Sequence, residues 1–327
     1  MKAVRIHETG SPEVLRLEEV AVPAPAAGQI LVRVAVAGVN FTDVMARQGI
    51  YISRDAAPAL PAVLGTEVAG VVTATGPDVA EDLIGRRVVA FVRGGYAEYA
   101  LAPRELVAPL PRAIDLADAT AFLVQGVTAW QLLRECGRIR PGESVVVHTA
   151  AGGVGTLAVQ LAKEFGARTV IATAGSAEKL KIAGDLGADA AVDYTVRGWA
   201  DMVRDATGGR GADIILDAVG GDVGEESLEC LAPHGRLVCY GVSSKLMAAF
   251  SGAQLMQKNQ SVIGYWLTGR LAADPGPVMK AVTDLLDLAG HHRIRAVVRH
   301  AYPLEEAADA HRAISARGTV GKVVLTI

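Results

Sequence analysis

The chain has 327 residues, more than one hydrophobic core usually organises, so we expect two domains. Hydrophobic residues make up 51% and charged residues 20%, which is typical of a globular protein rather than a disordered or fibrous one. The net charge of -3 provides no broad positive field to hold a polyanion, so no nucleic-acid partner is expected.

The cysteines and the lengths of the apolar segments indicate the cellular location of the protein. Cys136, Cys230 and Cys239 lack CxxC spacing, which indicates neither a disulfide framework nor a thiolate zinc site. Residues 1–10 contain no apolar stretch of signal-peptide length, and no segment approaches the roughly 20 apolar residues that span a bilayer. We therefore expect a soluble, cytoplasmic protein without a membrane partner.

The first third of the chain is β-rich. Runs of β-branched residues, punctuated by Gly or Pro, predict strands at residues 2–6, 30–36, 68–75 and 87–92. From Ala119 the apolar residues recur at three- and four-residue spacing, which predicts a helix that ends before Pro141-Gly142. We expect this helix to join the two domains.

A regular alternation of strands and helices follows. Strands are predicted at residues 144–148, 169–173, 190–193, 214–217, 236–240 and 261–265, and helices at 153–165, 177–186, 199–207 and 225–231. Strands that alternate with helices of this length form right-handed βαβ crossovers around a buried parallel sheet. The fold class is therefore α/β, with a doubly wound domain.

The tail contains a second, shorter set of elements. Its pattern predicts a helix at 277–288, a strand near 296–300, a helix at 304–315 and a final strand at 322–327. These elements either extend the doubly wound sheet or return to the first module, and the pattern alone leaves both places open.

A glycine-rich turn links the strand at 144–148 to the following helix. Residues 148–155 read HTAAGGVG, an AxGxxG pattern that begins at Ala150. Gly152 allows close approach of a pyrophosphate, Gly155 allows the helix to pack against the strand, and free backbone N–H groups hold the anion. The predicted pyrophosphate contacts are Ala151, Gly152, Gly153, Val154 and Gly155.

The end of the second strand indicates which dinucleotide binds. An NAD enzyme usually carries an Asp or Glu about 20 residues after the turn, to accept the ribose hydroxyls. Residues 167–177 contain no carboxylate; Gly175 and Ser176 end the strand, and Lys179 follows. Small polar residues, a helix N-terminus and a lysine favour a 2′-phosphate, and hence NADPH. The alternative is that Lys179 is an ordinary solvated helix residue.

Several motifs together point to a family. They are GSPEVL at 10–15, VNFTD at 39–43, GTEVAG at 65–70, GVTA at 126–129, HTAAGGVG at 148–155 and DAVGG at 217–221. Over essentially its whole length the chain resembles the zinc-independent, zeta-crystallin-like quinone oxidoreductases of the medium-chain dehydrogenase/reductase superfamily. The resemblance implies a GroES-like catalytic domain at 1–122, completed by 268–327, and a Rossmann NADPH-binding domain at 123–267.

The resemblance also implies that no metal is bound. In zinc-dependent relatives a Cys ligand stands at the position of Asn40, and a Gly-His-Glu replaces Gly65-Thr66-Glu67. Neither the thiol nor the imidazole is present, so nothing soft or basic remains to hold zinc at a tetrahedral site.

By family likeness, further residues bind the cofactor. Those implied for the 2′-phosphate are Gly175, Ser176, Lys179, Tyr194 and Arg317. Those implied for the nicotinamide and its ribose are Asn40, Thr128, Tyr240, Gly241 and Ser243, with Val219 among the other cofactor contacts.

The implied reaction is hydride transfer to a quinone or to the β-carbon of an α,β-unsaturated carbonyl. Such a reaction needs a donor for the charge that develops on the carbonyl oxygen, and Asn40 and Tyr51 are the catalytic candidates. Tyr51 is alternatively a surface aromatic. Asp43 and Glu67 are expected to hydrogen-bond the backbone rather than to act as acids or bases.

Other readings of function remain. A tyrosine usual in quinone oxidoreductases is Met45 here, which favours an enoyl reductase of a biosynthetic pathway as the alternative. An NADPH-binding relative without enzymatic activity, associated with membranes or RNA, is a third possibility. The strand at 261–265 is expected to form a sheet edge that pairs across a two-fold axis in a homodimer.

Overall fold

The computed structural model describes residues 1–51 and 57–327. The chain divides into two compact units. The first unit comprises Met1–Val127 and Asp274–Ile327, and the second comprises Thr128–Ala273. Among the described residues, no helix combines the length and the apolar character that a membrane crossing requires.

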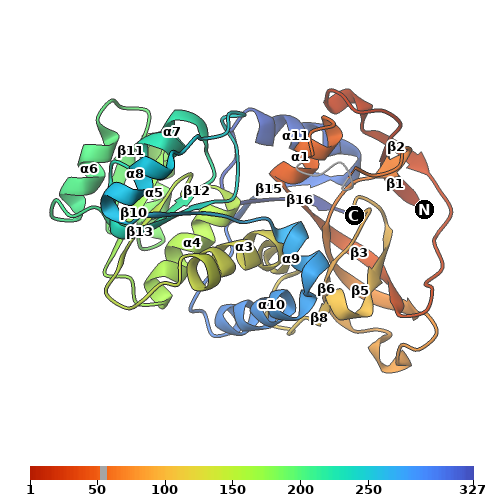
Figure 1. Cartoon of the computed structure of the whole chain (residues 1–327). Coiled ribbons are helices and arrows are strands. Elements are labelled where there is room, and N and C mark those ends of the chain that lie inside the picture. Colours follow the sequence, from red (N-terminus) through yellow and green to blue (C-terminus); the bar gives the residue numbers. More distant parts are fainter. Residues whose placement is uncertain (52–56) are drawn as a thin grey trace. The chain divides into compact units, whose positions relative to one another are not determined.

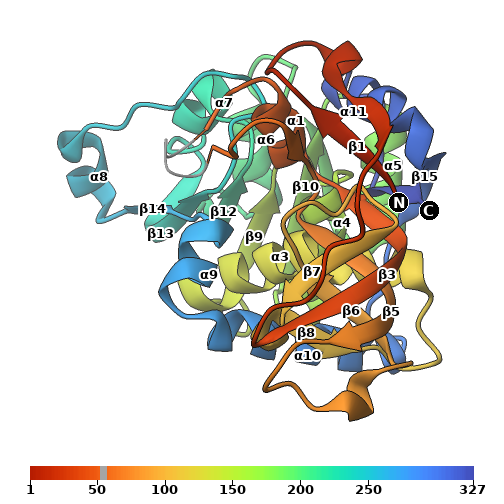
Figure 2. The same cartoon turned by 90° about the vertical axis from the view of Figure 1, so that its right-hand side faces the viewer.

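The second unit is built on a six-stranded sheet with the order β11-β10-β9-β12-β13-β14. Every neighbouring pair in it is parallel. The strands are β9 (Ser144–Val147), β10 (Thr169–Ala174), β11 (Ala190–Asp193), β12 (Ala212–Asp217), β13 (Leu231–Cys239) and β14 (Ser261–Gly264). The helices are α4 (Gly153–Glu164), α5 (Ala177–Asp185), α6 (Trp199–Ala206), α7 (Gly221–Glu226), α8 (Gly252–Lys258) and α9 (Leu267–Ala273). Figures 1 and 2 together label these elements, and the strand order confirms the expected doubly wound sheet.

The central strands of this sheet are buried on both faces. Every residue of β9 and β12 is buried, as expected for continuous apolar runs in a parallel sheet covered by helices. Val146, Ile215 and Leu237 pack with Trp199 and Val203 in one hydrophobic cluster. All six strands predicted for this region are present, and β14 is an edge strand, as expected.

One helix prediction in this unit is wrong. The expected helix at 225–231 starts four residues earlier, as α7, and Leu231 already belongs to β13. The carboxylate of Asp217 accepts hydrogen bonds from Val219 N and Gly220 N, which turns the chain into α7 directly after β12. Short α8 was not predicted; it is capped by Ser251 through a capping box with Gln254.

The first unit contains a seven-stranded sheet and a three-stranded sheet. The larger has the order β15-β16-β3-β5-β6-β8, with β7 also paired to β3, and the smaller has the order β2-β1-β4. The strands are β1 (Lys2–Ile6), β2 (Arg16–Glu19), β3 (Gln29–Val39), β4 (Ala62–Val63), β5 (Glu67–Thr75), β6 (Arg87–Phe91), β7 (Tyr99–Pro103), β8 (Val107–Pro109), β15 (Val298–Pro303) and β16 (Lys322–Thr326). Figure 2 shows β3, β5 and β6 side by side.

The helices of the first unit come from both of its chain segments. They are α1 (Phe41–Arg47), α2 (Leu116–Ala121), α10 (Pro275–Gly290) and α11 (Ala307–Ser315), with single 3-10 turns at Pro12–Val14, Glu81–Leu83, Arg104–Leu106 and Leu304–Glu306. The tail joins the first unit's sheet: β16 pairs antiparallel with β3, Val323 opposite Val39, and β15 pairs with β16. Of the two places left open for the tail, the structure therefore has the return to the first module.

The helix expected from Ala119 is interrupted twice. After α2, the π-helical segment η5 (Phe122–Gly126) leads into α3 (Val127–Gln131), and a second π-helical segment, η6 (Leu132–Cys136), follows. Such segments often mark functional sites because they release backbone groups from the regular ladder. Here the N–H of Val124 donates to the Glu67 carboxylate at 2.7 Å.

Candidate active site

The glycine-rich turn lies between β9 and α4. Gly152 precedes the helix as its N-cap, and its N–H bonds to Thr149 O at 2.8 Å. A Cβ at Gly155 would lie 2.7 Å from Ala150 Cα, closer than real side chains come, whereas at Gly152 the nearest atom would be Thr149 O at 3.1 Å. Gly155 is therefore required for the packing of α4 against the turn, and Gly152 leaves space in front of the helix N-terminus.

His148 lies fully buried at the start of this turn. Its Nδ1 is 2.7 Å from Thr173 Oγ1 and its Nε2 is 2.9 Å from Ser227 Oγ, so both ring nitrogens have hydrogen-bond partners. Burial lowers the pKa of His148 to about 4, so the ring is neutral near pH 7. His148 therefore has a structural role at the start of the turn.

Four of the residues predicted for the 2′-phosphate lie at the carboxyl ends of β10 and β11. Ala174 pairs with Asp193, which brings Gly175 beside Tyr194; a Cβ at Gly175 would be 3.8 Å from the Tyr194 ring. Ser176 caps α5, its Oγ accepting from Lys179 N at 3.4 Å. The fifth residue, Arg317, follows α11 in the first unit.

A carboxylate that was not predicted from the sequence lies in the same place. Asp193 is the last residue of β11, and its Oδ1 accepts hydrogen bonds from Thr195 N at 2.8 Å and Thr195 Oγ1 at 2.7 Å. The absence of a carboxylate was predicted for the end of β10 alone. The parallel strand order would have revealed Asp193, because neighbouring parallel strands end at the same sheet edge.

The residues expected near the nicotinamide from the second unit lie mainly after β12 and β13. Tyr240 N donates to Asp217 O at 2.9 Å, and Ser243 N donates to Ala218 O at 2.9 Å. Val219 and Gly241 adjoin the same two loops, so Val219, Tyr240, Gly241 and Ser243 lie together at this sheet edge. Thr128 is buried in α3.

Asn40 lies in a buried polar cluster of the first unit. Its Nδ2 donates to Glu67 Oε1 at 2.8 Å, and its Oδ1 accepts from Lys322 Nζ at 3.0 Å. Lys322 also forms an ion pair with Glu67, and both side chains are fully buried. Gln125 Nε2 is 3.3 Å from Asn40 Oδ1. The cluster joins β3, β5, β16 and η5.

The two carboxylates of the family motifs hydrogen-bond the backbone, as expected. Asp43 Oδ2 accepts from Asn40 N at 2.8 Å, and Glu67 Oε2 accepts from Val124 N at 2.7 Å. Burial raises the pKa of Asp43 to about 7, although the hydrogen bond from Asn40 N opposes the shift. The Tyr96 hydroxyl adds a hydrogen bond to Asp43 at 3.1 Å.

Lys322, Tyr96, His311 and Arg47 were not predicted as part of the site. The Tyr96 hydroxyl is 3.1 Å from His311 Nε2, and Arg47 Nε donates to His311 Nδ1 at 3.3 Å. Burial lowers the pKa of His311 to about 3. The one signal available was Lys322 itself, a charged residue that opens the otherwise apolar final strand.

Tyr51 is half-buried, and its hydroxyl donates to the Ala46 backbone oxygen at 2.8 Å. Burial raises the pKa of this hydroxyl, so it is a neutral donor near pH 7. Residues 52–56, which directly follow Tyr51, lie outside the described residues.

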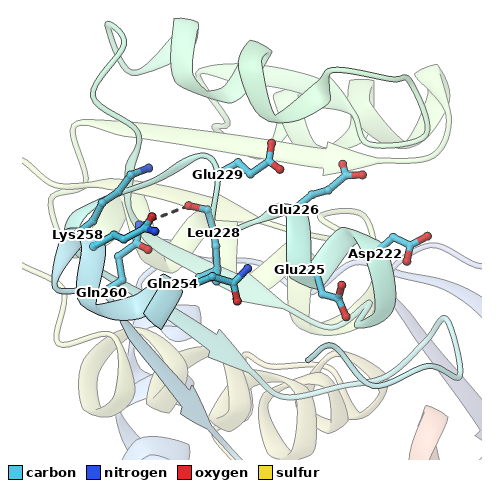
Figure 3. A pocket seen from close by; sticks show the side chains of 9 residues that line it. Asp222, Glu225, Glu226, Leu228, Glu229, Gln254, Lys258 and Gln260 are labelled. Carbon is cyan, nitrogen blue, oxygen red and sulfur yellow. Dashed lines mark hydrogen bonds between the residues drawn. The ribbon is translucent and has the colours of Figure 1, made fainter. Parts of the chain in front are cut away.

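Two further observations concern ligands. Within residues 1–51 and 57–327, there is no group of three or more His, Cys, Asp or Glu side chains that could hold a metal ion. A pocket of about 420 Å³ is lined by none of the predicted site residues. Figure 3 shows the side chains that line it. The carboxylates of Asp222, Glu225, Glu226 and Glu229 outnumber Lys258 there, so the pocket does not suit a phosphate.

Comparison with known proteins agrees with this arrangement. Residues 26–112 match the alcohol dehydrogenase GroES-like domain, and residues 153–301 match the zinc-binding dehydrogenase family. The quinone oxidoreductase of Pseudomonas aeruginosa is 35% identical over 326 residues, 99% of each chain. The 2-haloacrylate reductase of a Burkholderia species is 33% identical over 333 residues, 99% of this chain and 98% of the relative.

Solved structures give the same result. The Escherichia coli quinone oxidoreductase complexed with NADPH matches with a TM-score of 0.92 at 33% identity, covering 100% of each chain. The protein therefore belongs to the quinone oxidoreductase family of the medium-chain dehydrogenase/reductase superfamily. The expected fold, a GroES-like domain with a Rossmann domain, is confirmed, and so is the expectation that the chain is an oxidoreductase.

Proposed function

We propose that the protein is an NADPH-dependent, zinc-independent oxidoreductase that transfers hydride to a quinone or to an activated double bond. The observation that carries the proposal is the carboxyl edge of the second unit's sheet, where the glycine-rich turn is followed by Gly175, Ser176 and Lys179 at the end of β10, which has no carboxylate. The Asp193 carboxylate at the end of β11 accepts its hydrogen bonds from Thr195. A relative of known structure binds NADPH, which supports the same cofactor here.

The residues proposed for the cofactor form two groups. The turn residues 151–155 would bind the pyrophosphate through backbone N–H groups, and Ser176, Lys179, Tyr194 and Arg317, with Gly175, would surround the 2′-phosphate. Asn40, Thr128, Val219, Tyr240, Gly241 and Ser243 would contact the nicotinamide half. When bound, NADPH supplies the hydride. We accordingly take 123–267 as the NADPH-binding domain, and 1–122 with 268–327 as the catalytic domain.

The donors around Asn40 do not fit zinc, although one matching family is named for zinc binding. Asn40 Oδ1 and Glu67 Oε1 are the oxygens available there, and both are already hydrogen-bonded to the Lys322 ammonium. A dication beside a fully buried lysine would be repelled, and neither a thiolate nor an imidazole compensates.

Asn40 and Tyr51 are the proposed contacts to the substrate oxygen. The Asn40 amide has two N–H groups and Glu67 accepts one of them, which leaves one for a carbonyl that becomes negative. Tyr51 can donate only if its hydroxyl exchanges Ala46 O for the substrate.

The acceptor is proposed as a quinone, with an enone or enoyl substrate as the second candidate. Met45, in place of a tyrosine usual among quinone oxidoreductases, favours the second, and one relative is a 2-haloacrylate reductase. The three cysteines are free thiols, which supports a reducing, cytoplasmic location, and we also propose a homodimer.

The test measures NADPH oxidation with a panel of quinones, 2-alkenals and enoyl thioesters, before and after treatment with a metal chelator. We expect oxidation with at least one acceptor and unchanged rates after chelation. An enone consumed faster than every quinone would select the second candidate. Tight NADPH binding without any acceptor-dependent oxidation would instead indicate a non-enzymatic role, and loss of activity on chelation would reject zinc independence.

A further inference from the structure

Three buried side chains of the first unit form a row of hydrogen bonds. Lys322 is 1%, Asn40 4% and Gln125 9% exposed. Lys322 Nζ donates to Asn40 Oδ1 at 3.0 Å, and Gln125 Nε2 donates to the same oxygen at 3.3 Å. On its other side, Asn40 Nδ2 donates to Glu67 Oε1 at 2.8 Å.

The charges at one end of the row fix the orientation of the Asn40 amide. An ammonium group can only donate and an ionised carboxylate can only accept, so Asn40 must turn its oxygen to Lys322 and its nitrogen to Glu67. A flipped amide would place NH2 against the Lys322 ammonium and oxygen against the Glu67 carboxylate, losing both hydrogen bonds.

The orientation of Asn40 in turn fixes that of Gln125. Because Asn40 Oδ1 is an acceptor, Gln125 must present Nε2 to it, and Gln125 Oε1 is left at the end of the row. Within residues 1–51 and 57–327, this oxygen is one of two buried side-chain polar atoms without a hydrogen-bond partner. An unpartnered buried acceptor is unfavourable until a donor reaches it.

The backbone that carries Gln125 is attached to the same cluster. Gln125 lies in the π-helical segment η5, where the N–H of Val124 donates to Glu67 Oε2 at 2.7 Å. Glu67 thus holds the Asn40 amide with one carboxylate oxygen and the segment bearing Gln125 with the other. At Gly38 a Cβ would lie 2.7 Å from Lys322 Nζ, so the cluster also needs a glycine on β3.

We propose that Gln125 Oε1 is a specificity-determining hydrogen-bond acceptor for a neutral N–H or O–H group of the ligand that binds beside Asn40. Lys322 is then a positioning residue, because it fixes the orientation of the Asn40 amide and, through it, that of the Gln125 amide. This inference rests on the proposed function. Two ligands carry such a donor: NADPH, in its carboxamide and ribose hydroxyls, and the reduced acceptor, in the hydroxyl of a hydroquinone. In either case the site would select against a ligand that presents only an acceptor there.

The test compares wild type with Gln125→Met, which keeps the length of the side chain and removes its oxygen. Binding is measured by fluorescence titration with NADPH, with its 3-acetylpyridine analogue, in which a methyl group replaces the carboxamide NH2, and with a hydroquinone. If the carboxamide is the donor, wild type prefers NADPH over the analogue about tenfold and Gln125→Met loses that preference. If Gln125→Met loses tenfold in affinity for the hydroquinone alone, the donor is the hydroxyl of the reduced acceptor. If it loses tenfold in affinity for both NADPH and its analogue, the donor is a ribose hydroxyl.

Two further variants separate this role from a structural one. Gln48→Met, on an exposed glutamine of the same unit, is the matched control and should bind every ligand as wild type does. Lys322→Met with Glu67→Gln removes both charges together and frees the Asn40 amide to flip, so it should lose the same selectivity as Gln125→Met. Adding Gln125→Met to this double variant should then cause no further loss of ligand selectivity.

The failure of this proposal is distinguishable from that of the proposed function. If wild type does not bind NADPH, the proposed function fails and this inference fails with it. If wild type binds, and folded Gln125→Met binds NADPH, the analogue and the hydroquinone within twofold of wild type, the acceptor role alone is rejected. Retained selectivity in the Lys322→Met, Glu67→Gln variant rejects the positioning role of Lys322.

Discussion

The two glycines of the turn after β9 have different surroundings, and this predicts different consequences for alanine. Gly155→Ala places a methyl group 2.7 Å from Ala150 Cα and should destabilise the second unit by on the order of 1–3 kcal/mol. Gly152→Ala makes one tight contact, 3.1 Å to Thr149 O, and should lower the unfolding temperature less than Gly155→Ala does, yet bind NADPH about tenfold more weakly, because the methyl group occupies space needed by the pyrophosphate. Thermal unfolding and NADPH titration check both, and wild-type affinity in Gly152→Ala would contradict the assignment of this turn.

His148 predicts a pH dependence of stability. Its pKa is lowered to about 4 by burial, from 6.5, so between these values the unfolded chain binds a proton that the folded chain excludes. The free energy of unfolding therefore falls as the pH falls through this window, by up to about 1.4 kcal/mol per pH unit from this group.

The variant His148→Gln isolates that contribution. Asp43, whose pKa is raised to about 7, gives a slope of opposite sign in both proteins, so only the difference between them reports on His148. The stability deficit of His148→Gln, measured by urea unfolding, should be smaller at pH 5 than at pH 7. An equal deficit at both pH values would show that the ring is not held neutral.

Among the secondary-structure elements, the junction between β10 and α5 predicts that the protein prefers NADPH over NADH. Lys179 lies in the first turn of α5, after the Ser176 cap, where helix N-terminus and ammonium both favour an anion. Lys179→Ala should weaken NADPH binding about tenfold and NADH binding less than twofold, because only NADPH carries the 2′-phosphate.

A second lysine of the same helix provides the control. Lys181 is exposed and pairs with Asp185 at 3.1 Å, so Lys181→Ala should leave both affinities unchanged. Equal losses of affinity for NADPH and NADH in Lys179→Ala would mean that this lysine does not contact the 2′-phosphate.

At the scale of the whole molecule, the free edge of the second unit's sheet predicts a dimer. β14 ends the strand order, and its Val262 and Ile263 are only half-buried. An edge strand of this kind can pair with the same strand of a second copy. Wild type should sediment as a dimer at micromolar concentration and Ile263→Lys as a monomer. The control Met202→Lys, which also introduces a lysine but at an exposed position of α6, should remain dimeric. A monomeric wild type would reject the dimer.

Features that depend on neighbouring residues could be predicted from the sequence. Strand, turn and helix around residues 144–165 follow from an apolar run, then glycines, then helical spacing, and all lie within one short stretch. The missing carboxylate at the end of β10 is equally local. Short, exposed helices such as α8 escaped prediction because they have no buried face to impose a pattern.

Contacts between residues far apart in the sequence could not be predicted, because they depend on which strands pair. Asp193 comes beside Gly175 through the pairing of β10 with β11, and Lys322 reaches Asn40, 282 residues earlier, because β16 pairs with β3. Strand partners are chosen by the burial of whole faces, which no local spacing encodes. For this reason the sequence identified Asn40 and Glu67, but not the lysine and the glutamine that bond to the oxygen of the Asn40 amide.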